Sequence, residues 1–136
     1  MISLNLNALL EGFYIPSTKK MIPDTVRVEV RSFTQPYEKI DESAALIDSI
    51  GTGIFHFSNV NPDTDYRFVI RHRNHIETWS NSSPQRLYTC GSEYDFTRSD
   101  SCAFGRNLFL IDSSPLRFAL YSGDVNQDGI VDGSMD

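Results

Sequence analysis

The residues with the most specific chemistry lie in GDVNQDGIVDGSMD, where oxygen-bearing side chains recur at alternate positions. Calcium prefers about six to eight oxygen ligands, and a twelve-residue loop supplies them from alternate positions around a sharply turning glycine. Counting from Asp124 reproduces this spacing through the ninth position, with Gly129 at the turn. The expected ligands are the side chains of Asp124, Asn126, Asp128 and Asp132 and the backbone carbonyl of Ile130.

The twelfth position of this loop departs from the pattern. It is Met135 rather than a carboxylate, and Asp136 follows one residue later. Asp136 would become a ligand only through a local shift of the backbone, with water filling the rest of the coordination sphere. The sequence therefore predicts a weak Ca²⁺ site, with a Kd of about 0.1–1 mM or above. The alternative is a solvated acidic tail that binds no metal.

A second group of residues combines arginines with an indole. Arg67, Arg71 and Arg73 share one face of a predicted strand, and Trp79 follows shortly after them. Guanidinium groups beside an indole could recognise an acidic polymer or a glycan, with Arg71, Arg73 and Trp79 as binding residues. The alternative is a solvated sheet face whose arginines pair with glutamates such as Glu29, while Trp79 anchors the core.

The histidines and serines predict no catalytic site. His72 and His75 lie three positions apart, so on one strand they point to opposite faces and converge on a metal only if RNH forms a turn. His56 lies on another predicted strand, and we expect satisfied or surface histidines rather than zinc ligands. No serine lies in a recognisable nucleophile motif. The chain is therefore expected not to be an enzyme.

Cys90 and Cys102 are the two cysteines, and they lack the CxxC spacing of zinc and thioredoxin-like sites. In an oxidising compartment we predict a disulfide between them, which would close a loop of about ten residues and stabilise the fold by ~2–3 kcal/mol. The alternative is two unpaired thiols in or near the core. Between the cysteines, Tyr94 and Phe96 are expected to pack against the core.

The elements that position these residues are predicted to be strands. In TVRVEVRS, Val26, Val28 and Val30 alternate with charged residues, as half-buried antiparallel strands require. Turn-forming residues separate such segments and favour an all-β fold, an antiparallel β-sandwich of about seven strands, Ig-like or prealbumin-like. The predicted strands are SLNLNALL, TVRVEVRS, GIFHFSNV, DYRFVIRHR, QRLYTC, NLFLID and LRFALYS, with DESAALIDS as a short helix or a strand.

Length and charge limit the possibilities further. A chain of 136 residues is long enough for one domain with a core, here residues 1–122, followed by the calcium loop at 123–136. A formal net charge of −6 argues against a nucleic-acid partner, because phosphates need basic residues to neutralise them. No apolar run approaches the roughly 20 residues of a membrane span.

Two resemblances to known families follow from these motifs. YSGDVNQDGIVDGS closely resembles the first calcium-binding repeat of a type I dockerin, although a single, truncated loop matches. VIRHRNHIETWS, YDFT and AFGRN, followed by YSGDVNQDG, resemble a β-sandwich module near the C-termini of secreted proteins of Bacteroidetes-like and Ignavibacteria-like bacteria. The resemblance implies a secreted or cell-surface location in a bacterium, and no established catalytic activity.

Two functions follow from the sequence. The first is a non-catalytic accessory module with a structural Ca²⁺ loop, serving spacing, adhesion or assembly, with other secreted or cell-surface proteins or glycans as partners. Self-association stays open. The second is a carbohydrate-binding module that uses the arginine-rich strand and exposed aromatic residues, for which Tyr14, Tyr37, Trp79 and Tyr88 are candidates.

Overall fold

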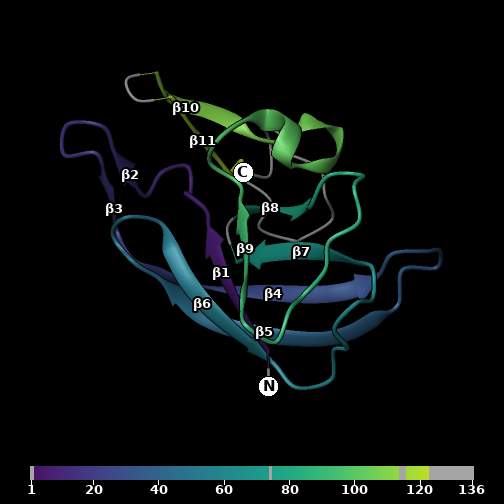
Figure 1. The fold of residues 1–136 in the computed structure, drawn as a ribbon. Helices are drawn as coiled ribbons and strands as arrows, with labels where there is room; N and C mark the ends of the chain where they lie inside the picture. Colours follow the sequence, from purple (N-terminus) through teal and green to yellow (C-terminus); the bar gives the residue numbers. More distant parts are fainter. Residues whose placement is uncertain (1, 74, 114–115, 123–136) are drawn as a thin grey trace.

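The computed structural model describes residues 2–73, 75–113 and 116–122, and these fold almost entirely into β-strands (Figure 1). The prediction of an all-β fold is confirmed. Eleven strands and two short 3-10 helices lie within the described residues, more strands than the seven or so expected. In chain order they are β1 (Ile2–Asn7), β2 (Tyr14–Ile15), β3 (Lys20–Met21), β4 (Asp24–Ser32), β5 (Lys39–Ile47), β6 (Thr52–Phe57), β7 (Tyr66–His72), β8 (His75–Trp79), β9 (Ser92–Asp95), η1 (Asp100–Cys102), η2 (Phe104–Arg106), β10 (Phe109–Ser113) and β11 (Leu116–Ala119).

The largest sheet has the strand order β5-β4-β7-β8, and each neighbouring pair is antiparallel. The alternation seen in the sequence decides which side chains turn inward. Val26, Val28 and Val30 of β4 are buried, as are Phe68 and Ile70 of β7. The charged residues between them therefore project from the opposite, outer face of the sheet.

A second sheet has the order β6-β1-β9. β1 pairs antiparallel with β6 but parallel with β9, so the expectation of purely antiparallel pairing is wrong at this point. β9 follows a long connection, residues 80–91, rather than a hairpin, so no tight turn forces it to run opposite to its neighbour. Leu4 and Leu6 of the central β1 are fully buried.

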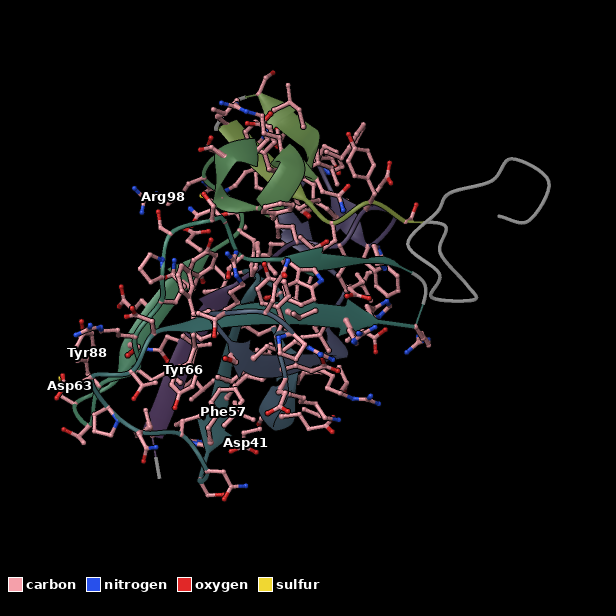
Figure 2. All side chains as sticks on the ribbon, turned by 90° about the vertical axis from the view of Figure 1, so that its right-hand side faces the viewer. Asp41, Phe57, Asp63, Tyr66, Tyr88 and Arg98 are labelled. Atoms are coloured by element: carbon pink, nitrogen blue, oxygen red, sulfur yellow. The ribbon has the colours of Figure 1, made fainter. Side chains whose placement is uncertain are left out.

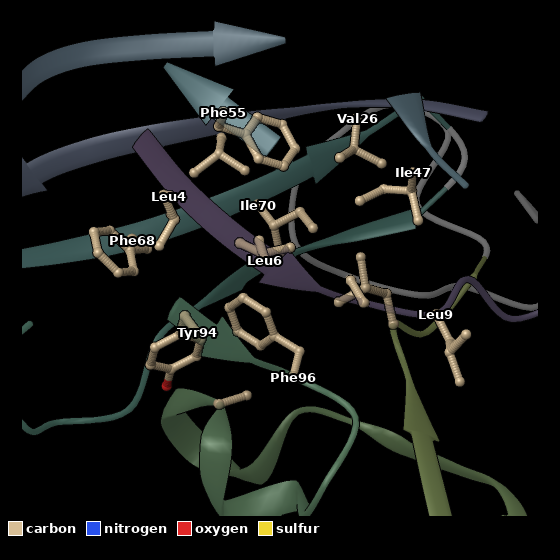
Figure 3. Packing of buried hydrophobic residues seen from close by; sticks show 14 of the residues in the cluster. Leu4, Leu6, Leu9, Val26, Ile47, Phe55, Phe68, Ile70, Tyr94 and Phe96 are labelled. Atoms are coloured by element: carbon tan, nitrogen blue, oxygen red, sulfur yellow. The ribbon is translucent and has the colours of Figure 1, made fainter. Parts of the chain in front are cut away.

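Side chains from the two sheets meet in one hydrophobic core (Figure 3). Leu4 and Leu6 of β1 pack in the same cluster as Phe68 and Ile70 of β7. Phe96 lies in this cluster directly after β9 and is 1% exposed, whereas Tyr94 is 9% exposed. The expected packing of these two aromatic residues against the core is confirmed.

Two small antiparallel pairs, β2–β3 and β10–β11, lie beyond the larger sheets (Figure 1). They are joined by polar contacts between residues far apart in the sequence. The Tyr14 hydroxyl donates to Asp112 Oδ2 at 2.7 Å, and Lys19 Nζ donates to the same oxygen at 2.8 Å. Burial is the largest cause that raises the pKa of Tyr14, followed by this hydrogen bond. Tyr14 is therefore a buried structural residue rather than an exposed aromatic platform.

At the opposite end of the molecule, Asp41 holds the loop that follows β6. Its Oδ2 accepts the backbone N–H groups of Ser58 and Asn59, both at 2.9 Å, next to Phe57 (Figure 2). The Tyr66 hydroxyl accepts the N–H of Asn61 at 2.9 Å in the same loop. Side chains thus satisfy backbone donors that the strands leave unpaired.

The sequence misassigned some segments. QRLYTC is not a strand, because in the described residues it makes one isolated pairing, Gln85 with Tyr66, before the chain turns and Tyr88 N–H donates to Ser92 Oγ. β8 and β9 were not among the predicted strands. DESAALIDS, left as helix or strand, lies mostly in β5.

Candidate functional site

The arginine-rich strand does expose its charged side chains on one face. In β7, Phe68 and Ile70 point into the core, so Arg67, Val69 and Arg71 lie on the outer face. The register between β7 and β8 sets Trp79 opposite Val69. The face formed by β4, β7 and β8, called the outer face below, therefore combines the predicted arginines with the predicted indole.

A hollow of about 230 Å³ opens beside the indole, lined by Tyr37, Arg67, Trp79 and Phe104, and we call it the Trp79 pocket. The rings of Tyr37 and Trp79 meet edge to face, with centroids 5.7 Å apart and planes at 69°. Phe104 of η2 reaches this hollow because Ser80 and Ala103 form an antiparallel bridge. The bridge brings Trp79, just before Ser80, close to Phe104, just after Ala103. Phe104 is 60% exposed, which is unusual for so large an apolar side chain.

The loop that carries Tyr37 is held in position by β4. Arg31 Nη1 donates to the Tyr37 carbonyl at 3.1 Å, and the Arg31 guanidinium lies 5.6 Å from the Trp79 ring centroid. Trp79 is half-buried, and its indole N–H donates to Glu77 at 2.6 Å. Trp79 is not part of the buried core cluster, so the interpretation of this residue as a core anchor does not hold.

Arg67 differs from the other arginines of the outer face. Its guanidinium lies over Phe33 at 4.7 Å and over Tyr37 at 5.2 Å, and its Nε donates to the Phe33 carbonyl. Among the described residues, no carboxylate lies within ion-pair distance of Arg67, whereas Arg71 pairs with both Glu29 and Glu77. The alternative of a sheet face whose arginines pair with acids therefore fits Arg71 but not Arg67.

Glu29 is the centre of this ion-pair network. It is 4% exposed, and its carboxylate contacts Arg31 at 2.7 Å and Arg71 at 2.9 Å. Two cations around one buried carboxylate compensate for its desolvation and orient both guanidinium groups. Arg71 is thus held by structural contacts, which limits its freedom to reach a ligand.

A second, shallow hollow of about 500 Å³ lies farther along the outer face. Its lining includes Arg27 of β4, Arg71 of β7 and Arg73 just beyond β7. Arg27 pairs with Glu42 at 3.4 Å, and Arg73 pairs with Asp24 at 2.9 Å. The three predicted arginines therefore line two adjacent hollows rather than one, with Arg67 in the Trp79 pocket and Arg71 and Arg73 in the other.

His72 and His75 converge, because His72 is the last residue of β7, His75 is the first of β8, and the antiparallel register pairs them directly. Their Nδ1 atoms lie 2.8 Å apart, and the ring centroids are separated by 4.7 Å. His72 Nε2 contacts Asp24 Oδ2 at 2.9 Å, and His75 Nε2 contacts the Glu11 carbonyl at 2.8 Å. The ring of Phe13 packs against both histidines.

The electrostatics of His75 follow from its position in the core. Burial is the largest cause that lowers the pKa of His75 to about 4, so this ring is neutral near pH 7. Its hydrogen bond to the Glu11 carbonyl acts in the opposite direction and raises the pKa, but by less than burial lowers it.

The contact with His72 favours the charged form of the Asp24 carboxylate. The His72 hydrogen bond is the largest cause that lowers the pKa of Asp24 to about 2, aided by the Thr25 N–H and by Arg73. This chain of contacts is structural in character, because each of the four ring nitrogens has a protein partner. Within the part of the chain that the structure describes, no three His, Cys, Asp or Glu side chains gather closely enough to hold a metal ion.

The remaining predicted site residues are the calcium ligands and the cysteines. Asp124, Asn126, Asp128, Ile130, Asp132 and Asp136 all lie outside the described residues. Cys90 and Cys102 are free thiols, so the predicted disulfide is absent from this structure. Cys90 lies in an exposed turn before β9, whereas Cys102 lies beyond β9 in η1 and packs partly against the core, where burial raises its thiol pKa.

One serine–histidine contact occurs on the exposed side of β1 and β6. Ser3 Oγ lies 3.0 Å from His56 Nδ1. A nucleophile–base pair also needs a third group that orients the histidine. No such carboxylate contact to His56 is found in the described residues, so this pair lacks the geometry of a triad.

Sequence reasoning missed Phe33 and Phe104. Neither residue is close in sequence to Arg67 or Trp79, and no periodicity marks them as exposed. The signal for Phe104 is the pairing of Ser80 with Ala103, which exists only in the folded chain. Tyr37, by contrast, is among the aromatic residues that the sequence offers as candidates for exposure on one face.

No protein-family model, curated protein or solved structure matches this chain. The resemblances to a type I dockerin repeat and to a secreted β-sandwich module therefore stay predictions from short motifs. In the described ranges, no helix has the length and apolar character needed to cross a membrane.

Proposed function

We propose that this chain is a non-catalytic accessory module that binds a glycan in the Trp79 pocket. The observation that carries the proposal is the pocket itself, in which Tyr37, Trp79 and Phe104 surround a surface hollow of about 230 Å³. Apolar faces of sugar rings pack against aromatic rings, and fixed polar groups beside the rings give orientation. The volume is below the roughly 300–1,000 Å³ of sites that enclose a drug-sized ligand, which suits one sugar unit of a longer chain.

Of the two functions that the sequence predicts, glycan binding has the firmer support in the described residues. A module that served only for spacing has no need of a 60% exposed phenylalanine next to an indole. The proposed architecture is a β-sandwich, supported by one core shared between the β5-β4-β7-β8 and β6-β1-β9 sheets. In this proposal the module works outside a bacterial cell, on glycans of a surface or of the surroundings.

The experiment that tests glycan binding uses the single tryptophan as its reporter. A panel of soluble oligosaccharides is titrated into the protein while Trp79 fluorescence is followed, and binding is confirmed by calorimetry. We expect at least one glycan to change the emission, and Phe104→Ala to weaken its binding about tenfold or more, because one aromatic wall is lost.

Tyr88→Ala is the matched control for this test. Tyr88 is 47% exposed and lines a different hollow from the Trp79 pocket, and Figure 2 shows it near Asp63. The control is expected to bind like the parent protein. If no oligosaccharide changes the emission or the heat of a folded sample, or if both variants behave alike, the glycan-binding proposal is rejected.

A further inference from the structure

We propose that the glycan bound in the Trp79 pocket is acidic, a polysaccharide that contains uronic acids, and that Arg67 binds its carboxylate. This inference rests on the proposed function and names its ligand class. It starts from a contrast between arginines. Arg27, Arg31, Arg71 and Arg73 of the same region each contact a carboxylate of the protein, and Arg67 contacts none among the described residues.

The guanidinium of Arg67 is oriented without being neutralised. It lies over Phe33 and Tyr37 at 4.7 and 5.2 Å, and its Nε bonds to the Phe33 carbonyl. No acceptor in the described residues binds its two Nη groups. Stacking on aromatic faces holds the planar fork in one orientation, so less entropy is lost when a ligand binds.

The surroundings of Arg67 strengthen its attraction for an anion. Tyr37, Trp79 and Phe104 keep water from one side of the pocket, and the Coulomb energy of an ion pair rises as the local dielectric constant falls. A carboxylate matches the two parallel N–H donors of a guanidinium edge. A uronic acid has a group that complements each part of the pocket: a sugar ring that packs against the aromatic walls and a carboxylate that pairs with Arg67.

The adjacent hollow indicates which way an acidic polymer would extend. Arg71 is shared between the ion-pair network and the second hollow, where Arg27 and Arg73 also lie. These arginines are paired with protein carboxylates, so their contribution to a polymer is smaller than that of Arg67. Arg67 is therefore the main cationic contact that this face offers to a polymer, in a chain whose formal net charge is −6.

The test compares a pair of ligands that differ only in charge. Oligogalacturonate and the same oligomer after reduction of its carboxyl groups to hydroxymethyl groups are titrated by calorimetry at low salt. We expect the acidic oligomer to bind at least about tenfold more tightly than its reduced counterpart, and its affinity to fall as sodium chloride is raised. If the two oligomers bind equally, the acidic-ligand inference is overturned while glycan binding stands.

Two variants and one control assign the effect to Arg67. Arg67→Gln is expected to remove the preference for the acidic oligomer, and Arg67→Lys to restore part of it because charge returns without the planar fork. Arg86→Gln, which removes an exposed arginine paired with Asp65, is expected to change nothing. An unaltered preference in Arg67→Gln, with folding verified by circular dichroism, overturns the role of this residue.

Two further outcomes separate this inference from the proposed function. If polyglutamate binds as tightly as oligogalacturonate, the site recognises carboxylates without a sugar, and the glycan assignment is wrong for both proposals. If neither oligomer nor any neutral glycan binds the folded protein, the proposed function itself fails.

Discussion

Arg67 and Arg71 illustrate how residues of the same type on the same strand face acquire different roles from their partners. The period of two along β7 predicts that both project outward. It does not predict that Glu29, buried on β4, would hold Arg71, since that contact spans 42 residues of sequence. Nor does it predict that Phe33 and Tyr37 would lie beneath Arg67. The face of the sheet on which each arginine projects was therefore predictable from the sequence. The carboxylate or aromatic partner of each arginine was not.

The buried histidine pair gives a pH dependence of stability at the residue scale. His75 has a folded pKa of about 4, below the ordinary histidine value of 6.5, so the unfolded chain binds more protons between these two values. Stability is therefore lost as the pH falls through this window. Between pH 7 and pH 5 the expected loss from His75 is about 2 kcal/mol, measured by urea unfolding at the two values.

Substitution of this histidine checks the assignment. His75→Gln is expected to lower stability at pH 7, because a buried hydrogen bond is disturbed, yet to reduce the difference between pH 7 and pH 5 by most of that amount. The control is His56→Gln, since His56 is exposed and its loss should leave the difference intact. A pH dependence that is the same in parent and His75→Gln would contradict the assignment.

At the scale of elements, the connection from β5 to β6 is one of the places where the chain passes from one large sheet to the other. Asp48 Oδ1 accepts the N–H groups of Ile50 and Thr52, both at 3.0 Å, and closes the turn. Gly51 has φ +85°, and a Cβ there would lie 2.9 Å from the Ala8 carbonyl oxygen. Because the Ala8 carbonyl belongs to the backbone just after β1, a side chain at position 51 would fit only if that backbone moved.

Replacement of Gly51 by alanine therefore tests this corner. A left-handed conformation costs an alanine about 1–2 kcal/mol, and the backbone clash adds to it, so we expect Gly51→Ala to destabilise by more than about 2 kcal/mol. Gly12→Ala is a matched control, because Gly12 has φ +89° and open space where its Cβ would lie. Urea unfolding of both variants measures the difference, and equal losses would show that the close approach to Ala8 is unimportant.

The elements that the sequence predicted well are those with uninterrupted alternation, namely β1, β4, β6 and β7. β8 was missed because HIETW is short, and β9 was missed because its pairing with β1 joins residues about 88 positions apart. The Trp79 pocket was not predictable for the same reason, because it joins residues far apart in the sequence. Its lining comes from β7, from β8, from the loop after β4 and from η2, and no local pattern connects these four segments.

For the whole molecule, the described body ends in a well-fixed residue. Ser122 pairs with His75, and both its N–H and its hydroxyl donate to Glu11 Oε1 at 2.9 Å. The predicted boundary between body and calcium loop falls at the next residue, Gly123. This proximity raises the question of whether calcium binding and folding of the body are coupled.

We expect calcium binding by the loop and folding of the body to be independent of each other. Calcium at 10 mM should shift the NMR signals of the amides from Asp124 to Asp132, and Asp128→Ala should abolish the shift, because three aspartates gathered in one loop need a cation to offset their repulsion. For a Kd of 0.1–1 mM, a coupled site would stabilise the whole chain by about 1.4–2.7 kcal/mol. An independent loop leaves the urea midpoint of the body unchanged. If calcium does not shift the amide signals of the loop, the predicted calcium site is wrong. If the signals shift and the urea midpoint also rises, body and loop form one cooperative unit, and the predicted boundary at Gly123 is wrong.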